Sequence, residues 1–112
     1  MNAADDWIAT VAVESIDPEY PVMARLGEVE VALCRVDDDV FAIGNICTHA
    51  FARLSDGFQE GAEVFCPLHQ GSFDVRTGAA IAAPCHEPVR SYPTRVEDGI
   101  VHVCPVARAM VA

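Results

Sequence analysis

Basic residues are scarce in this chain: 7 Lys and Arg stand against 17 Asp and Glu, which gives a formal net charge of −10. Nucleic acids and anionic membrane surfaces attract proteins through basic patches, so this charge balance argues against both as partners. An acidic surface instead suits encounters with basic patches on other proteins.

Long apolar runs and a basic leader are also lacking. No stretch approaches the ~18 to 20 apolar residues of a membrane span. The first ten residues, MNAADDWIAT, are acidic where a secretory signal is basic. We therefore expect a cytoplasmic protein with no membrane contact. At 112 residues and 52% apolar composition, the chain is expected to fold as one domain, residues 1–112.

No segment carries the apolar stripe of an amphipathic helix, and short β-rich runs separated by turn residues dominate instead. Asp98-Gly99 is a strong hairpin signal between two of these runs. The pattern predicts an all-β fold, an antiparallel sandwich or barrel that residues 47–72 interrupt. The predicted runs are residues 7–13, 20–26, 28–36, 39–46, 72–78, 90–97 and 99–103.

Five cysteines are an odd number for a disulfide framework, and cysteines clustered with histidines in a reducing compartment indicate a metal site. One residue separates Cys47 from His49, two separate Cys66 from His69, and sixteen lie between the pairs. Each pair follows a strand-like run. Both pairs are therefore expected at strand-to-loop transitions, where loops can direct side chains to a common centre.

Three interpretations of these pairs compete. Unrelated core and surface residues fit poorly, because four soft ligands fall in two tight pairs. Structural zinc accepts two Cys and two His, but zinc fingers usually take a Cys pair from one segment and a His pair from the other. A Rieske [2Fe–2S] centre has two thiolates on one iron and two imidazoles on the other, which explains why each loop offers one of each.

The stretches CTH at 47–49 and CPLHQGSFDVRTG at 66–78 resemble the Rieske proteins. With LSDG at 54–57 and APCHEPVRSYPTRVEDG at 83–99, the chain is most similar to the small Rieske ferredoxins of bacterial aromatic-ring-hydroxylating dioxygenase systems, such as those for biphenyl or cumene. The resemblance implies the Rieske fold, an antiparallel β-sandwich base with a small inserted cluster-binding subdomain at about residues 45–75.

The resemblance also implies a site. Cys47 and Cys66 would hold the buried iron of one [2Fe–2S] cluster, and His49 and His69 the outer iron. Pro84, in a proline-bearing third loop, would help to cover the cluster. We expect an apolar docking patch around the exposed histidine edges, formed by Pro67, Leu68, Gln70 and Pro84.

The implied function is that of a monomeric one-electron carrier and not of an enzyme. It would take electrons from an FAD-containing, NAD(P)H-dependent ferredoxin reductase and pass them to the Rieske centre of a terminal oxygenase. Two alternatives remain: a Rieske-type small subunit of a complex like that of assimilatory nitrite reductase, and a structural zinc-binding domain.

Respiratory Rieske proteins have similar ligands, but they carry two more cysteines where this chain has Ala52 and Leu68. They also carry hydroxyl side chains, which donate to cluster and cysteine sulfur, where this chain has Gly71 and Phe73. Hydrogen bonds to charged groups contribute ~1.5–3 kcal/mol each. Since ~1.4 kcal/mol equals ~59 mV for one electron, losing two donors lowers the potential by roughly 130–250 mV. We therefore expect a value near the ~−150 mV lower limit of Rieske centres.

The other cysteines are not expected to bind metal. Cys34 and Cys104 lie in strand-like runs and are interpreted as core thiols. Cys85 and His86 adjoin the third loop, but consecutive residues of an extended chain point to opposite sides and cannot readily chelate one metal together. We expect Cys85 to pack close to the cluster without binding it.

Overall fold

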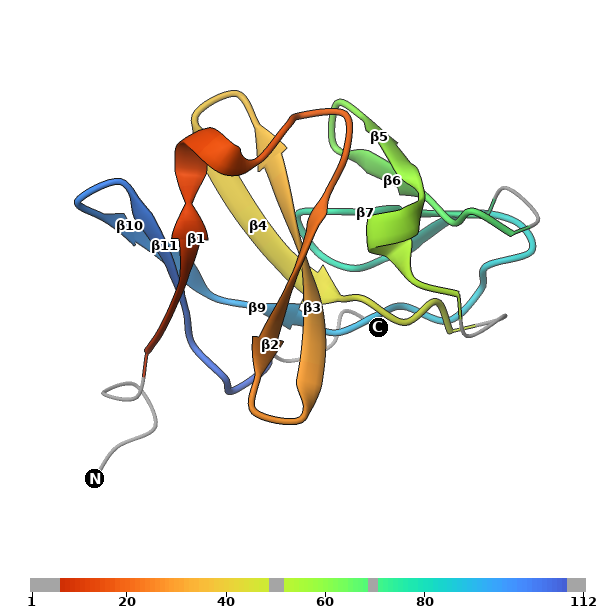
Figure 1. Ribbon diagram of the computed structural model, residues 1–112. Helices are drawn as coiled ribbons and strands as arrows, with labels where there is room; N and C mark the ends of the chain where they lie inside the picture. Colours follow the sequence, from red (N-terminus) through yellow and green to blue (C-terminus); the bar gives the residue numbers. More distant parts are fainter. Residues whose placement is uncertain (1–6, 49–51, 69–70, 109–112) are drawn as a thin grey trace.

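Antiparallel strands dominate the computed structural model of the chain, which describes residues 7–48, 52–68 and 71–108. The prediction of an all-β antiparallel fold is confirmed (Figure 1). The strands form three sheets. The first contains β1 (Ile8–Ala12), β11 (Ile100–Val103) and β10 (Thr94–Glu97); the second β2 (Val22–Leu26), β3 (Val29–Val36), β4 (Asp39–Gly44) and β9 (Ser91–Tyr92); the third β5 (Phe58–Glu60), β6 (Glu63–Phe65), β7 (Ser72–Asp74) and β8 (Ala80–Ala82).

The second sheet is the middle layer of the molecule, and its side chains alternate between two cores. Leu33 and Ala42 pack into the core shared with β1 and β11. Their neighbours Cys34 and Ile43 pack into the core shared with the third sheet. Cys34 is fully buried, in agreement with its interpretation as a core thiol.

Tight two-residue turns connect the long strands. Asp98 and Gly99 join β10 to β11 with φ of 53° and 78°, which is the left-handed geometry that the Asp-Gly pair predicts. Asp37 adopts φ of 55° in the turn between β3 and β4, and this acidic turn is exposed.

Several predicted strands are shorter or divided in the structure. The run 72–78 keeps only β7 (Ser72–Asp74) as strand. The run 7–13 ends in a 3₁₀ turn, η2 (Val13–Ser15). The run 90–97 divides at Pro93, which has no N–H for a ladder. Before it, β9 pairs with β4; after it, β10 pairs with β11, so the chain changes sheet at this proline.

The third sheet lies at the end of the molecule opposite the β10–β11 hairpin (Figure 1). It extends beyond residue 75, because β8 pairs with β7. A short 3₁₀ turn, η3 (Leu54–Asp56), leads into it, with Leu54 fully buried. Within the described residues, the helical turns are all too short to cross a membrane.

Candidate metal centre

Two loops at the edge of the third sheet share the same construction. The first loop, residues 47–52, is enclosed by the antiparallel bridge of Ile46 with Arg53. The second loop, residues 66–71, is enclosed by the pairing of Phe65 with Ser72. Each therefore spans six residues and begins with a buried cysteine.

The same hydrogen bond closes each loop. The Cys47 N–H donates to the carbonyl of Ala52 at 2.7 Å, and the Cys66 N–H donates to the carbonyl of Gly71 at 2.7 Å. Because both bonds join the first residue to the last, each cysteine occupies the same place at the root of a hairpin tip. The sequence offers no direct sign of this backbone equivalence, since the two tips share only the leading cysteine and a later histidine.

A buried asparagine holds the first loop at its base. Asn45 is fully buried, and its amide N–H group donates to the Ser55 hydroxyl at 3.0 Å and to the Glu30 carboxylate at 3.3 Å. Its side-chain oxygen accepts the Ser55 N–H at 2.8 Å, and its backbone carbonyl accepts the Leu54 N–H at 2.7 Å. One side chain thus joins the strand that enters the loop, the turn that leaves it, and β3.

Glu30 continues this network toward the surface. Its carboxylate accepts two hydrogen bonds from Arg53, at 2.9 and 3.2 Å, and lies 3.5 Å from the Arg25 guanidinium. The Arg53 hydrogen bond, supported by the one from Asn45, lowers the pKa of Glu30 below its ordinary value. The pair is bidentate, which fixes Arg53 next to the end of the first loop.

The second loop is held by the strands that flank it and by close packing. The Ser72 hydroxyl donates to the Glu63 carboxylate at 2.5 Å, across the β6–β7 pair. Phe73 is fully buried in the core below the loop. Gly71 and Phe73, the two positions compared with respiratory proteins, carry no hydroxyl, and the one hydroxyl between them is directed to Glu63.

A third segment, residues 83–88, lies against both loops. The Thr48 hydroxyl of the first loop donates to the carbonyl of Glu87 at 2.8 Å. From the second loop, Gly71 approaches Cys85 so closely that a Cβ atom on the glycine would lie 2.3 Å from the Cys85 sulfur. The segment therefore joins the two loops, and its role as a loop that covers the cluster stays a prediction.

Three buried sulfur atoms meet between these segments. Cys47 Sγ lies 3.8 Å from Cys85 Sγ. Burial, with a contribution from a side-chain interaction with Cys47, raises the pKa of the Cys66 thiol to about 11. Burial, with a contribution from Cys47, raises the pKa of Cys85 to about 12. Without metal, Cys66 and Cys85 are thus protonated at neutral pH, and a metal that binds Cys66 must displace its proton.

The donor set and its setting fit a cluster with mixed ligands. Two cysteine sulfurs from separate loops, Cys47 and Cys66, interact directly in a buried site. The remaining two expected ligands, His49 and His69, lie outside the described residues. Among the described residues alone, no group of three or more Cys, His, Asp or Glu side chains could hold a metal, so Cys47, Cys66 and Cys85 do not form a three-cysteine site.

The predicted docking residues divide into three groups. Pro67 and Leu68 are exposed beside Cys66, and the Leu68 side chain is 48% accessible. Pro84 is half-buried next to Cys85. Gln70 lies outside the described residues.

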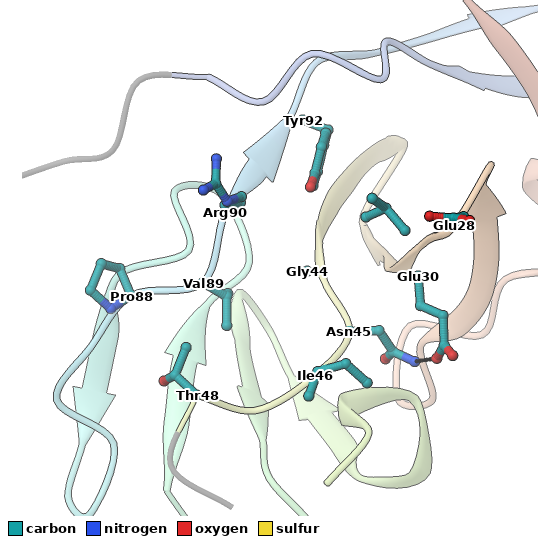
Figure 2. Close-up of a pocket in the computed structure, with 11 residues that line it drawn as sticks. Glu28, Glu30, Gly44, Asn45, Ile46, Thr48, Pro88, Val89, Arg90 and Tyr92 are labelled. Carbon is teal, nitrogen blue, oxygen red and sulfur yellow. Dashed lines mark hydrogen bonds between the residues drawn. The ribbon is translucent and has the colours of Figure 1, made fainter. Parts of the chain in front are cut away.

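A separate cavity of about 420 Å³ lies beside the first loop. Figure 2 shows it between the Asn45–Thr48 stretch and residues Pro88, Val89 and Arg90. The lining residues that the structure describes include neither a cysteine nor a histidine.

Sequence reasoning missed the support for the first loop, Asn45, Glu30 and Arg53. The role of Asn45 could have been predicted from the sequence. It stands two residues before Cys47, an expected ligand, and a buried asparagine side chain must find hydrogen-bond partners. The partnership of Glu30 with Arg53 spans 23 residues and depends on sheet register, which the sequence does not display.

The chain is similar in sequence to known proteins. Residues 6–93 match the family of Rieske [2Fe-2S] domains. The chain is 43% identical over 98 residues to the anthranilate 1,2-dioxygenase ferredoxin subunit of Burkholderia cepacia, which covers 88% of this chain and 91% of that protein. It is 47% identical over 94 residues to the ferredoxin component of the naphthalene 1,2-dioxygenase system of Pseudomonas aeruginosa, over 83% of this chain and 89% of that protein.

The chain is also similar in structure to a solved protein. The chain superimposes with a TM-score of 0.85, at 32% identity, on a chain from the complex of reduced oxygenase and oxidized ferredoxin in carbazole 1,9a-dioxygenase. The match covers 92% of this chain and 96% of that one.

Proposed function

Because this chain belongs to the family of Rieske [2Fe-2S] domains, we propose that it carries single electrons to the Rieske centre of a terminal aromatic-ring-hydroxylating oxygenase. Its electrons would come from an FAD-containing ferredoxin reductase that oxidises NAD(P)H in the cytoplasm. The prediction of one Rieske [2Fe–2S] cluster is confirmed by the family match and the ferredoxin relatives.

The pair of matched loops carries this proposal. Cys47 and Cys66 would hold one iron through thiolates, and His49 and His69 the other through imidazoles. When bound, the cluster supplies a one-electron couple. The hydrogen bonds from the Cys47 and Cys66 N–H groups fix the two loops around it, so little rearrangement should accompany a change of one charge.

The similar proteins favour the interpretation of this chain as a free electron carrier over its interpretation as a subunit fixed to a larger chain. The chain covers 91% of a ferredoxin subunit and 89% of a ferredoxin component, so it aligns with carriers over nearly their whole length. The solved carbazole 1,9a-dioxygenase complex places a ferredoxin of the same fold on an oxygenase. A net charge of −10 suits docking to basic surfaces on both partners.

The docking face would lie at the tips of the two loops. Leu68 is a large apolar side chain with 48% exposure, directly after the Cys66–Pro67 pair. Thr48, on the first loop, and Ile46, directly before it, are exposed on either side of Cys47. An apolar patch at this point would bring a partner against the ligand loops, while acidic residues farther away would steer the encounter.

Stopped-flow mixing tests the proposal. Chemically reduced protein is mixed with an oxidised terminal oxygenase of the naphthalene or anthranilate type, and the transfer rate is followed in the visible bands. We expect rapid reoxidation of the carrier, slower at higher salt because screening weakens steering. No transfer to any such oxygenase, from protein with a full cluster, would contradict the assigned role.

A matched pair of variants tests the docking face. Leu68→Asp should slow transfer strongly, whereas Val96→Asp should leave it unchanged. Val96 is equally exposed, at 47%, but lies on β10 at the opposite end of the molecule (Figure 1). Equal rates for both variants would show that the contact lies elsewhere.

A further inference from the structure

Cys85 occupies a place that the expected ligand set does not explain. It is 5% exposed, in the segment that joins the two loops, and its sulfur lies 3.8 Å from Cys47 Sγ. This distance falls within the range of a sulfur hydrogen bond. The next residue, His86, is exposed, so the chain directs Cys85 inward and His86 outward.

The second loop is shaped to admit this sulfur. A Cβ atom at position 71 would lie 2.3 Å from Cys85 Sγ and 3.2 Å from the Cys85 backbone nitrogen. The Gly71 carbonyl also accepts the Cys66 N–H, so the glycine cannot easily move away. The space that a side chain at position 71 would need is therefore filled by the thiol of Cys85.

The direction of the hydrogen bond follows from ligation. In the chain without metal, either thiol of the Cys47–Cys85 pair could donate. A cysteine that binds iron does so as the thiolate and has no proton to give. With Cys47 on iron, Cys85 is the only donor of the pair.

We propose that Cys85 is a positioning residue that donates its S–H to the sulfur of Cys47 and thereby raises the reduction potential of the cluster. The inference rests on the proposed function, in that it takes Cys47 as a ligand. A donor to a ligand sulfur stabilises the reduced state more than the oxidised state, because the reduced state is more negative. No bond to Cys85 forms or breaks when the electron arrives.

A donor at Cys85 changes the reduction potential that we expect from the sequence. That expectation counted two hydroxyl donors as lost, at positions 71 and 73. The Cys85 thiol restores one donor close to position 71, although a thiol is a weaker donor than a hydroxyl. The potential should therefore lie above the value expected for a centre without either donor.

Redox titration of cluster-loaded variants tests this inference. Cys85→Ala should favour the oxidised form roughly 2- to 10-fold at a fixed applied potential, as expected for the loss of one modest hydrogen bond. Cys85→Ser, which keeps a donor, should titrate above Cys85→Ala. Cys104→Ala is the matched control, because Cys104 is equally buried at 7% exposure and should leave the potential unchanged.

Two further measurements separate a donor from a packing role. Cys85→Val fills the site without a donor and should titrate like Cys85→Ala, even if the gap left by alanine lowers cluster yield. In pulsed EPR of reduced protein exchanged into D₂O, one deuteron coupling should disappear in Cys85→Val and persist in Cys85→Ser. If Cys85→Val leaves both the potential and this coupling at wild-type values, the inference is overturned.

Failure of the proposed function would look different. Visible absorption and iron content of wild-type protein report first whether a cluster is held. A wild-type protein with a full cluster and a potential that is insensitive to Cys85 would contradict only the role of Cys85. A wild-type protein without a cluster would contradict the ligand assignment itself.

Discussion

The two ligand loops have the same backbone closure but are held in place by different forces. The first loop is held by the hydrogen bonds of the buried Asn45 amide and by the Glu30–Arg53 ion pair. In the second, adjacent strands and the close contact of Gly71 with Cys85 fix the loop by shape. The same backbone geometry at Cys47 and Cys66, the two expected ligand cysteines, is thus stabilised in two different ways.

The difference follows from where each loop sits. The first loop leaves the middle sheet and crosses to the third sheet, so it has no continuous strand pair beneath it and needs side-chain partners. The second loop is the tip of the β6–β7 hairpin, whose ladder already sets its base. The first loop should therefore respond mainly to loss of hydrogen bonds, and the second to added volume.

The largest expected effect is common to both loops. Cys47→Ser and Cys66→Ser should each abolish the visible absorption of the purified protein, because each would remove one of the two thiolates on the same iron. Cys104→Ala should retain the full absorption and iron content. A variant of either loop that kept a normal spectrum would remove that cysteine from the ligand set.

Asn45→Ala should break the first loop. It removes three side-chain hydrogen bonds and leaves the part-buried Ser55 N–H without its acceptor. We expect a loss of ~2–4 kcal/mol in the free energy of unfolding, measured by urea denaturation. Ser72→Ala, the counterpart beside the second loop, removes one bond and should cost only ~0.5–1.5 kcal/mol. A larger effect at Ser72 would reverse the comparison.

Gly71→Ala should break the second loop by volume. The new methyl group would meet the Cys85 sulfur at 2.3 Å, and overpacking of this kind costs ~1–3 kcal/mol. Gly44→Ala, near the entrance to the first loop, meets no atom closer than 3.7 Å and should change stability by less than ~0.5 kcal/mol. Thermal unfolding of both variants measures the contrast, and equal losses would contradict it.

The smallest effect concerns pH and the Glu30 carboxylate, which lies beside the first loop. The pKa of Glu30 is lowered in the folded chain, so its contribution to stability is present above the ordinary carboxylate pKa. That contribution is lost as pH falls through the lower, folded-state pKa. Glu30→Gln should therefore flatten the acid side of the stability curve below about pH 4.5. Urea unfolding at a series of pH values would contradict this if both proteins showed the same slope.

Local patterns were sufficient to predict much of the fold. Alternation of apolar residues located the long strands, and Asp98-Gly99 marked a hairpin with the expected left-handed dihedrals. The strand change at Pro93 was missed, although a proline without an N–H gives a physical reason for it. The short strands β5 and β8 were missed as well, because three residues are too few for a periodic signal.

The candidate site was predictable to a different degree in each part. The spacing predicted the two cysteines and two histidines as ligands, because few metal centres require mixed pairs, and this set stays a prediction. The Asn45 network and the contact of Gly71 with Cys85 join residues that are 10 to 23 positions apart or lie on different segments. Such contacts depend on sheet register and loop packing, which no local pattern encodes. The expectation that Cys85 packs close to the site agrees with its position beside Cys47; that it does not bind metal stays a prediction.

We propose above all that each of the two loops, residues 47–52 and 66–71, gives one cysteine and one histidine to a single cluster. Pulsed EPR of the reduced protein, prepared with ¹⁵N-labelled histidine, tests it most directly. We expect two histidine nitrogen couplings in the wild-type protein. Of the variants His49→Cys and His69→Cys, any that retains a cluster should show only one such coupling. A reduced [2Fe–2S] signal without any histidine nitrogen coupling would contradict the account, because the cluster would then be held by sulfur alone.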